Sequence, residues 1–338
     1  MTVLATKYLD HTVIILDDYI YCGCQKFQVS ELAAFIARYN PPENLIAEGW
    51  AKYTGELTSF ETYKDLSKHE NRYARIALAK HFNTPVEILK VLSGDSDYWV
   101  RLEVALNPNT PVDVLRVLSV DCDYDVRAAV AKNTNTLIEV LKVLNTDYRY
   151  MVRQSVAKNP NTPIDILNVL STDDSGEVKE AVAKNPKTPT KILRTLSKDD
   201  YYGVREVVAS NPKTPNDILS ALSADLSAWV RSSVAKNPKT PTKILRALSK
   251  DDRYGVREVV ASNPKTPNDI LSALSKDDYY GVREAVASNP KTPIKILRAL
   301  SKDDHYLTRV AVSHNPNFYY KVFLAAVHLW TILIRVSK

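Results

Sequence analysis

Apolar residues recur along the chain in two groups that repeat every 26 residues. In one repeat, Val204, Val207 and Val208 have the spacing i, i+3, i+4, which places them on one face of a helix. Ile218 and Leu222 mark a second such face in the same repeat. Two helices of about ten residues are too short to be stable alone, so each must bury its apolar face against a neighbouring repeat. The pattern therefore predicts an all-α solenoid of two-helix repeats.

The segment Asn-Pro-Lys-Thr-Pro at residues 211–215 separates the two predicted helices. It ends the first helix because a residue that precedes proline avoids the α-helical region. We expect Thr214 to be the N-cap of the second helix, with Pro215 at N1 and Asp217 at N3 in an acidic variant of the capping box. The threonine side chain is therefore expected to fix the start of that helix.

Three columns of similar residues keep one register through ten repeats without an insertion. We expect each residue of the basic column to bond acidic or carbonyl groups of a neighbouring repeat, because a guanidinium suits bidentate pairing with a carboxylate. We expect each asparagine to bond the local backbone of its turn. The basic column is Arg75, Arg101, Arg127, Arg153, Lys179, Arg205, Arg231, Arg257, Arg283 and Arg309; the asparagine column is Asn107, Asn133, Asn159, Asn185, Asn211, Asn237, Asn263, Asn289 and Asn315; and a leucine column runs from Leu66 to Leu300.

The ten repeats occupy residues 67–316, and the last of them is incomplete. We expect residues 1–66 to form an irregular N-terminal cap region that contains a degenerate repeat half. We expect residues 317–338 to form a helix that caps the last repeat. The alternative for this apolar tail is a membrane anchor, but Lys321 and His328 interrupt it, so we expect no membrane partner.

The repeat resembles the leucine-rich repeat variant (LRV) family, whose pattern is Val-Arg-x-x-Val-Ala-x-Asn-Pro-x-Thr-Pro-x-x-Ile-Leu-x-x-Leu. Residues 230–248 read Val-Arg-Ser-Ser-Val-Ala-Lys-Asn-Pro-Lys-Thr-Pro-Thr-Lys-Ile-Leu-Arg-Ala-Leu, which matches that pattern. The resemblance covers residues 67–316. It implies a HEAT-like helical repeat solenoid that is a right-handed superhelix, with α-helices alternating with 3₁₀ helices.

Some members of that family carry an N-terminal iron–sulfur domain with four cysteine ligands. This chain departs from that pattern because it has three cysteines, Cys22, Cys24 and Cys122, and Cys122 lies inside a repeat. The alternative is a cluster shared between chains, or a metal held with His11. We expect no metal and no cofactor. Three unevenly placed cysteines also favour a reducing, cytoplasmic compartment.

Residue types and motifs give no sign of an enzyme. The six histidines show no metal-ligand spacing, and no glycine-rich phosphate loop or nucleophile motif is present. Acidic pairs such as Asp251-Asp252 stand at predicted helix starts, where carboxylates serve as caps. We therefore expect no catalytic residues and no small-molecule substrate.

A tyrosine column and the variable position just before it are candidates for exposed contacts. Packing between repeats is the favoured interpretation of the tyrosines, and a row of aromatic ligand contacts is the alternative. Because the preceding position varies inside a rigid repeat, we expect it to be exposed. The tyrosines are Tyr98, Tyr124, Tyr150, Tyr202, Tyr254, Tyr280 and Tyr306, and the variable residues are Asp97, Asp123, Arg149, Ser175, Tyr201, Ser227, Arg253, Tyr279 and His305.

Positive charge is concentrated in the C-terminal repeats. The chain carries +6, whereas residues 181–302 contain 22 Lys and Arg against 12 Asp and Glu, a net +10. Part of this charge recurs every 52 residues at the spacing i, i+3, i+7, which places each trio on one helix face. Each leading lysine replaces an acid near a helix start, where it opposes the helix dipole. The candidate binding residues are Lys191, Arg194, Lys198, Lys243, Arg246, Lys250, Lys295, Arg298 and Lys302.

Two functions are consistent with this sequence. The first is a non-catalytic scaffold that binds a macromolecular partner, a protein by preference, along the surface of the solenoid, because such folds offer long binding surfaces. The alternative is binding of a nucleic-acid backbone through the basic C-terminal repeats. A recent duplication that carried exposed lysines along would equally explain the 52-residue period, since residues 181–232 and 233–284 are nearly identical.

Overall fold

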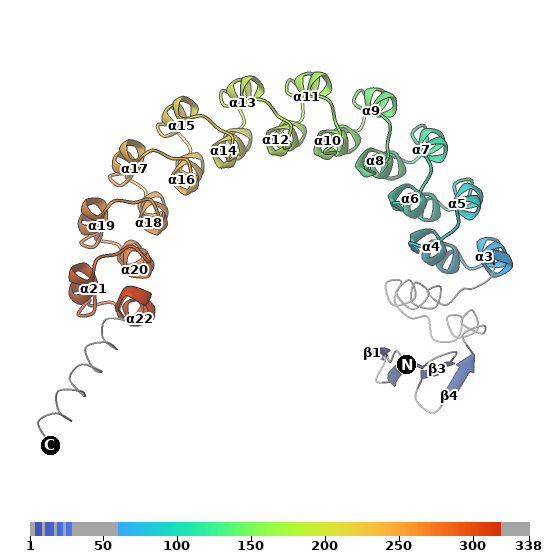
Figure 1. Ribbon diagram of the computed structural model, residues 1–338, viewed down its shortest axis with the longest axis horizontal. Coiled ribbons are helices and arrows are strands. Elements are labelled where there is room, and N and C mark those ends of the chain that lie inside the picture. The colour runs from blue at the N-terminus through green and yellow to red at the C-terminus, as the bar shows by residue number, and fades with distance from the viewer. Residues whose placement is uncertain (1–3, 9–10, 17–18, 23–24, 29–59, 319–338) are drawn as a thin grey trace, which may run out of the picture. The chain divides into compact units, whose positions relative to one another are not determined.

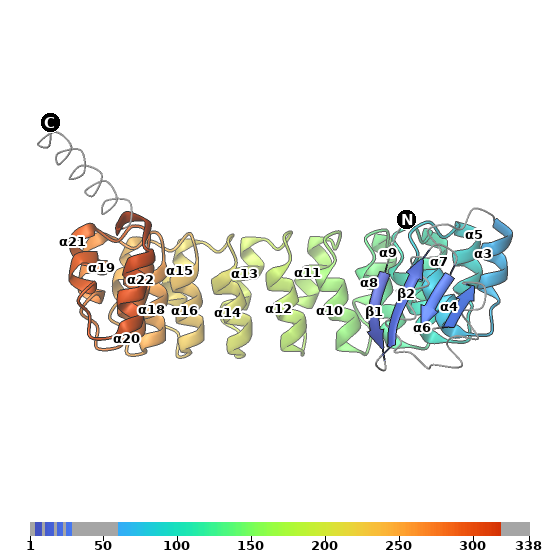
Figure 2. The same ribbon diagram turned by 90° about the horizontal axis from the view of Figure 1, so that it is seen from below.

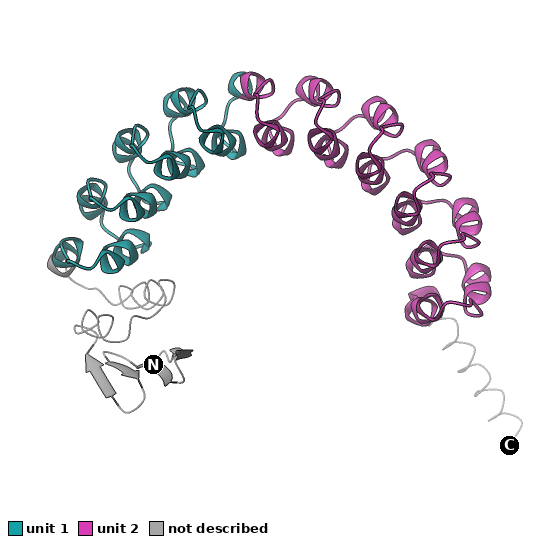
Figure 3. Cartoon of the chain, turned by 180° about the vertical axis from the view of Figure 1, so that it is seen from behind, with its two compact units in different colours: residues 1–166 teal, residues 167–338 magenta. Residues whose placement is uncertain are grey.

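The computed structural model describes residues 4–8, 11–16, 19–22, 25–28 and 60–318 (Figure 1). The chain divides into two compact units, residues 1–166 and 167–338, called unit 1 and unit 2 below (Figure 3). The tail predicted to cap the last repeat lies outside the described residues beyond position 318. No helix among the described residues is both long enough and apolar enough to cross a membrane.

Each repeat contributes one helix of nine residues, the long helix, and one of seven residues, the short helix (Figures 1 and 2). A further helix, α3 (Phe60–Ser67), occupies the place of a short helix before the first long one. The long helices are α4 (Arg72–Lys80), α6 (Tyr98–Leu106), α8 (Tyr124–Lys132), α10 (Tyr150–Lys158), α12 (Gly176–Lys184), α14 (Tyr202–Ser210), α16 (Ala228–Lys236), α18 (Tyr254–Ser262), α20 (Tyr280–Ser288) and α22 (Tyr306–His314). The short helices are α5 (Val86–Leu92), α7 (Val112–Leu118), α9 (Ile138–Leu144), α11 (Ile164–Leu170), α13 (Thr190–Leu196), α15 (Asn216–Leu222), α17 (Thr242–Leu248), α19 (Asn268–Leu274) and α21 (Ile294–Leu300).

The core of each unit is a layer between its two rows of helices. Val230 and Val234 of α16 and Leu245 of α17 have no exposed surface, and the equivalent positions of other repeats are buried in the same way. Within each unit, every long helix packs against the long helix of the next repeat, whereas a short helix packs on its flanking long helices. In unit 2 the long helices consequently line the inner side of the curve and the short helices its outer side (Figure 3).

Both helices of the repeat are α-helices. In α17, Leu245 N–H donates to the carbonyl of Pro241 and Ser249 N–H to that of Leu245, which is the i to i−4 pattern. Bonds of the i to i−3 type occur at the two ends of this helix, from Ile244 N–H to Pro241 and from Lys250 N–H to Ala247. The alternation with 3₁₀ helices that the family resemblance implied is therefore absent from the described repeats, and the all-α solenoid is confirmed over residues 60–318.

The threonine of each turn does not cap the short helix, so the capping prediction was wrong. The N-cap of α17 is Pro241, and no side chain bonds the first N–H groups of the helix. Thr240 is buried instead, and its hydroxyl donates to the carbonyl of Val234 in the preceding long helix. The same carbonyl also accepts from the N–H of Asn237 at 3.2 Å, so the threonine adds a second donor at the end of the long helix. The threonine therefore bonds the long helix that precedes the turn, and not the short helix that follows it.

The basic column forms the expected ladder between repeats. In a typical rung, Arg205 donates from Nε and Nη2 to Asp225, 20 residues further on, at 2.6 and 2.9 Å. Its Nη1 also donates to the carbonyls of Asp199 and Asp200 at 2.7 and 3.0 Å. Lys179 makes the same ion pair with Asp199 at 2.7 Å. Equivalent arginine rungs join Arg75 to Asp95, Arg101 to Asp121, Arg127 to Asp147, Arg231 to Asp251, Arg257 to Asp277 and Arg283 to Asp303.

The asparagine column bonds its own turn, as predicted, and also joins consecutive repeats. The Oδ1 of Asn237 accepts from the N–H of Lys239 at 2.9 Å. Its Nδ2 donates to the carbonyls of Ala209 and Asn211 in the preceding repeat at 2.6 and 3.0 Å. The side chain is buried, so these bonds satisfy backbone groups that water does not reach. One residue type therefore closes the turn and sets the stacking distance.

Residues 4–8, 11–16, 19–22 and 25–28 form β-strands, which the all-α expectation did not include. The strands β1 (Leu4–Tyr8), β2 (His11–Leu16), β3 (Tyr19–Cys22) and β4 (Gln25–Gln28) make one antiparallel sheet in that order. Two residues separate each strand from the next, a spacing typical of hairpins. The register pairs Val13 with Cys22. The other cysteine of the candidate metal cluster, Cys24, lies outside the described residues.

Candidate partner-binding surfaces

The basic residues predicted as a binding face lie on the short helices and the turns that follow them. Lys191 and Arg194 are on α13, and Lys198 follows its end; the trios headed by Lys243 and Lys295 have the same places on α17 and α21. All nine side chains are exposed. The structure thus places each trio on the outer row of unit 2, away from the long helices.

Two of the arginines in these trios are already paired. Arg194 bonds Asp217 of the next short helix at 2.5 Å, and Arg246 bonds Asp269 in the same way. The arginine hydrogen bond is the main reason that the pKa of each aspartate lies below its usual range. The lysines therefore carry most of the charge that this face offers to a partner.

A second row of lysines, which was not predicted from the sequence, lies along the turns of unit 2. Each stands two residues after the column asparagine of its turn, and each is exposed. In unit 1 the same position holds an asparagine, and Asn135 uses its amide to donate to the carbonyl of Pro108 at 2.6 Å. The fixed offset from the Asn-Pro pair could have revealed the column. Its members are Lys187, Lys213, Lys239, Lys265 and Lys291.

The long helices of unit 2 present acids where the turns present lysines. Glu180, Glu206, Glu258 and Glu284 occupy one position of successive long helices, and Ser232 interrupts them. Burial raises the pKa of Glu258, and the neighbouring Glu284 raises it further. Like charges in successive repeats thus repel one another on this row. A cationic group from a partner would relieve that repulsion.

Aromatic side chains at the N-terminal ends of the long helices stack from one repeat to the next. The ring centroids of Tyr254 and Tyr279 are 3.9 Å apart, and those of Tyr280 and His305 are 3.7 Å apart. Tyr306 continues the row beside His305. Tyr254 and Tyr306 are nevertheless about half exposed or more. The tyrosine column therefore packs between repeats, as the favoured interpretation held, and leaves part of each ring at the surface.

The repeat at residues 223–248 interrupts this aromatic row and opens a groove. Leu226 is 99% exposed and Trp229 is 68% exposed, values unusual for side chains of their size. Both lie beside Tyr254 in an open groove of about 720 Å³ between the N-terminal ends of α16 and α18. Arg253 and Asp252 also line it. The groove therefore combines an exposed apolar surface with charged residues at its edge.

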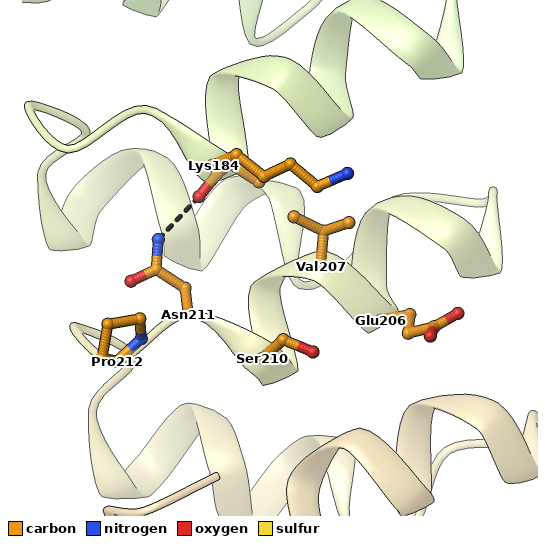
Figure 4. Close-up of a pocket in the computed structure, with 7 residues that line it drawn as sticks. Lys184, Glu206, Val207, Ser210, Asn211 and Pro212 are labelled. Atoms are coloured by element: carbon orange, nitrogen blue, oxygen red, sulfur yellow. Dashed lines mark hydrogen bonds between the residues drawn. The ribbon is translucent and has the colours of Figure 1, made fainter. Parts of the chain in front are cut away.

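A smaller hollow lies between α12 and α14, at the other end of the long helices (Figure 4). It encloses about 340 Å³ and is lined by Lys184, Glu206, Val207 and Ser210. Asn211 also lines it, and its amide donates to the carbonyl of Ala183 at 2.6 Å. No histidine or cysteine stands among the residues that line it. Across the described part of the chain, no group of three or more His, Cys, Asp or Glu could hold a metal ion.

Comparison with known proteins finds one family model and several solved structures to which the chain is similar. The family model described as "Leucine rich repeat variant" matches residues 98–123, which is one repeat. The chain is an LRV-like helical repeat protein. The structure of a leucine-rich repeat variant with a novel repetitive motif is similar to it at 23% identity, with a TM-score of 0.49, over 74% of this chain and 88% of that one.

Two other helical repeat structures are more distant. The YibA protein of Escherichia coli is 17% identical, with a TM-score of 0.37, over 80% of this chain and 95% of that one. A chain of the Pds5–Scc1 complex is 13% identical, with a TM-score of 0.29, over 84% of this chain and 54% of its own length. No curated protein matches the sequence.

Proposed function

We propose that this LRV-like protein is a non-catalytic scaffold that binds a protein partner through the exposed face of its long helices. The observation that carries the proposal is that some columns of residues have fixed partners within the fold, whereas another column is exposed and varies. The arginine and asparagine columns hold neighbouring repeats together, and the threonine column holds the turn within each repeat. The exposed position at Trp229 instead varies between repeats, as Trp99, Met151, Glu177 and Gly203 show.

The proposal of a non-catalytic role follows from the same division. The side chains that have fixed partners serve stacking, and the two recesses described above are lined by no histidine or cysteine that could act as base or nucleophile. Variation on an exposed face of a rigid repeat is the way in which solenoids acquire partners. A free and exposed thiol at Cys122 suits a reducing compartment, so we place this function in the cytoplasm.

Affinity capture from a lysate of the native cells tests this function. The full chain should retain a set of proteins that survives nuclease treatment. A variant with Glu206→Lys and Glu284→Lys, which reverses charge on the long helices, should lose that set. The matched control carries Lys191→Glu and Lys243→Glu on the short helices and should keep it. Capture that disappears with nuclease, or equal capture by both variants, would contradict the proposal.

A second candidate is binding of a nucleic-acid backbone along the turns of unit 2. The specific observation in its favour is the exposed row from Lys187 to Lys291, with one lysine in each turn and the lysines of the short helices nearby in sequence. Such a row would contact phosphates without reading bases. Retention of nucleic acid by the charge-reversed long-helix variant, and its loss from the short-helix variant, would favour this function.

A further inference from the structure

The groove beside Trp229 differs from the rest of unit 2 by a small set of substitutions. Residues 181–232 and 233–284 are two copies of a 52-residue block that differ at nine positions. Of the residues at those nine positions in either copy, six line the groove: Ala224, Leu226, Ala228, Trp229, Ser232 and Arg253. Differences spread without function would scatter over the exposed surface. Their concentration on one recess indicates selection for a function of that recess.

The substitutions are coupled in a way that creates exposed apolar surface. In the sister repeats a tyrosine covers the glycine that corresponds to Trp229: a Cβ on Gly281 would come within 2.7 Å of the Tyr279 ring, and one on Gly203 within 2.8 Å of the Tyr201 ring. Ser227 replaces that tyrosine in the altered repeat, which makes room for a side chain at position 229. The tryptophan that enters this room stays largely uncovered.

The charge changes around the groove sum to a more positive recess, although Ala224 replaces Lys276 of the sister copy. Leu226 and Ser232 replace the acids Asp278 and Glu284 of the sister copy, and Arg253 stands where the other copy has Tyr201. The Arg253 side chain is 72% exposed, and its ion pair is a 4.0 Å contact with Asp252. That aspartate is already bonded to Arg231 at 3.0 Å. The guanidinium of Arg253 is therefore available to bind a carboxylate of another molecule.

The rim of the groove is held in place before any partner arrives. Arg231 donates to the backbone carbonyls of Asp225 and Leu226 at 2.8 and 3.2 Å. It also donates to both carboxylate oxygens of Asp251 at 2.6 and 2.8 Å. An exposed leucine on a fixed backbone loses little conformational freedom on binding, which favours affinity.

We propose that this groove binds a segment of a partner protein that inserts one aromatic or aliphatic side chain between Leu226, Trp229 and Tyr254 and places a carboxylate on Arg253. The inference rests on the proposed scaffold function and names its principal contact. Tryptophan and arginine are the residues that most often dominate binding at protein interfaces. The groove takes a protein segment in preference to a polyanion because its apolar residues outnumber its free cations.

Selection of a displayed library of random 12-residue peptides on the full chain tests the proposal. Enriched peptides should share an apolar side chain with an aspartate or glutamate within about three residues of it. Synthetic peptides should bind the parent and bind Trp229→Gly and Leu226→Asp at least about 10-fold more weakly. Both substitutions restore residues that sister repeats carry at the same positions, so folding is preserved.

Two controls separate the groove from other surfaces. Trp99→Gly removes an exposed tryptophan at the same position of another repeat, where Ser96 and Asp123 replace Leu226 and Arg253, and should leave affinity unchanged. In the Arg253→Tyr variant, exchange of the peptide carboxylate for its amide should no longer weaken binding. That loss of coupling identifies Arg253 as the group that receives the carboxylate.

Three results would overturn the inference: no enriched peptide, enriched peptides that bind Trp229→Gly as tightly as the parent, or self-association of the parent that this substitution abolishes, which would assign the groove to a second copy. Lysate capture distinguishes these from failure of the scaffold function. Equal, nuclease-resistant capture by the parent and Trp229→Gly leaves the scaffold standing without this groove. Absence of nuclease-resistant capture removes the scaffold function itself.

Discussion

At the scale of single residues, stacking depends on side chains that serve two repeats at once. The asparagine column is the clearest case, because its amide satisfies two buried carbonyls of the preceding repeat while its oxygen holds its own turn. A buried polar group that loses its partner costs more than a normal hydrogen bond contributes. The repeat can therefore vary its surface freely but cannot vary this position without a penalty.

The two asparagines of one turn provide a matched test. Asn133→Ala leaves the carbonyls of Ala105 and Asn107 without their amide donor and should lower the free energy of unfolding by about 2–3 kcal/mol. Asn135→Ala removes an exposed bond to Pro108 and should cost less than about 1 kcal/mol. Urea denaturation followed by circular dichroism measures both. Equal losses would show that the buried amide has no special role.

The acidic partners of the ladder make stability depend on pH. Burial alone would raise the pKa of Asp303, but Arg283 and the N–H of His305 outweigh it and lower the pKa to about 2. The pKa of Asp225 and of Asp277 is lowered in the same way. A carboxyl group whose pKa is depressed in the folded state stabilises the fold above its unfolded pKa near 4 and ceases to do so as pH falls through the folded value.

We therefore expect the free energy of unfolding to fall as the pH is lowered from about 4 to about 2. Asp303→Asn should destabilise the chain by roughly 1 kcal/mol at pH 7, after allowance for solvent screening, and by much less at pH 2.5. The exposed neighbour Asp304 offers a control, since Asp304→Asn should change stability little at either pH. Urea titrations at the two pH values measure the difference. An equal loss at both would contradict the ionic role.

At the scale of the helix, the two helices of a repeat begin in different ways. Side chains cap some long helices, as Asp97 does for the N–H of Trp99 at 2.9 Å. The short helices α13 and α17 begin at a proline without a side-chain cap. A charge in their first turn therefore affects stability through its interaction with the helix dipole alone. Lys191 and Lys243 are positive charges at the positive end of that dipole, as Lys295 is in α21, so this interaction is unfavourable.

The triple variant Lys191→Glu, Lys243→Glu and Lys295→Glu separates a binding role from inherited surface charge. It should be as stable as the parent or more stable, by up to about 1 kcal/mol for each helix, because glutamate suits the first turn. If these lysines contact phosphates, the variant should bind duplex DNA more weakly at every sequence tested. Thermal unfolding and fluorescence anisotropy measure the two effects. Unchanged DNA binding would mark the lysines as surface that a duplication carried along.

Sequence periodicity was sufficient to predict the helices, because they depend on the local pattern of apolar residues. It was also sufficient to predict the arginine ladder, because each repeat supplies one basic residue and one acidic partner. It failed at Thr240, since the same residue can bond forward to the next helix or back to the previous one. It also failed for β2, where the run Val13–Leu16 alternates too little to distinguish strand from helix. The groove was missed because Leu226 and Arg253 belong to different repeats and meet in space alone.

At the scale of the whole molecule, charge is divided between the edges of unit 2. The turns and the outer row carry lysines, and the long helices carry glutamates. A partner with one sign of charge would therefore be directed to one edge. If the turn lysines make about five phosphate contacts, the logarithm of affinity for duplex DNA should fall against the logarithm of salt concentration with a slope of about −4.5. A flat dependence, measured by anisotropy from low to physiological salt, would exclude the backbone-binding candidate.

The arginine rungs also have a mechanical consequence. Each rung ties a repeat to its neighbour over 20 residues, so a pulling force applied at the chain ends loads the rungs in series. When one repeat yields, 26 residues are released, which lengthens the chain by about 90 Å at full extension. Repeats of nearly equal strength should yield one after another, and an optical trap should record a regular sawtooth of force against extension. Such a molecule would behave as an extensible spring whose repeats refold one after another when the load is removed.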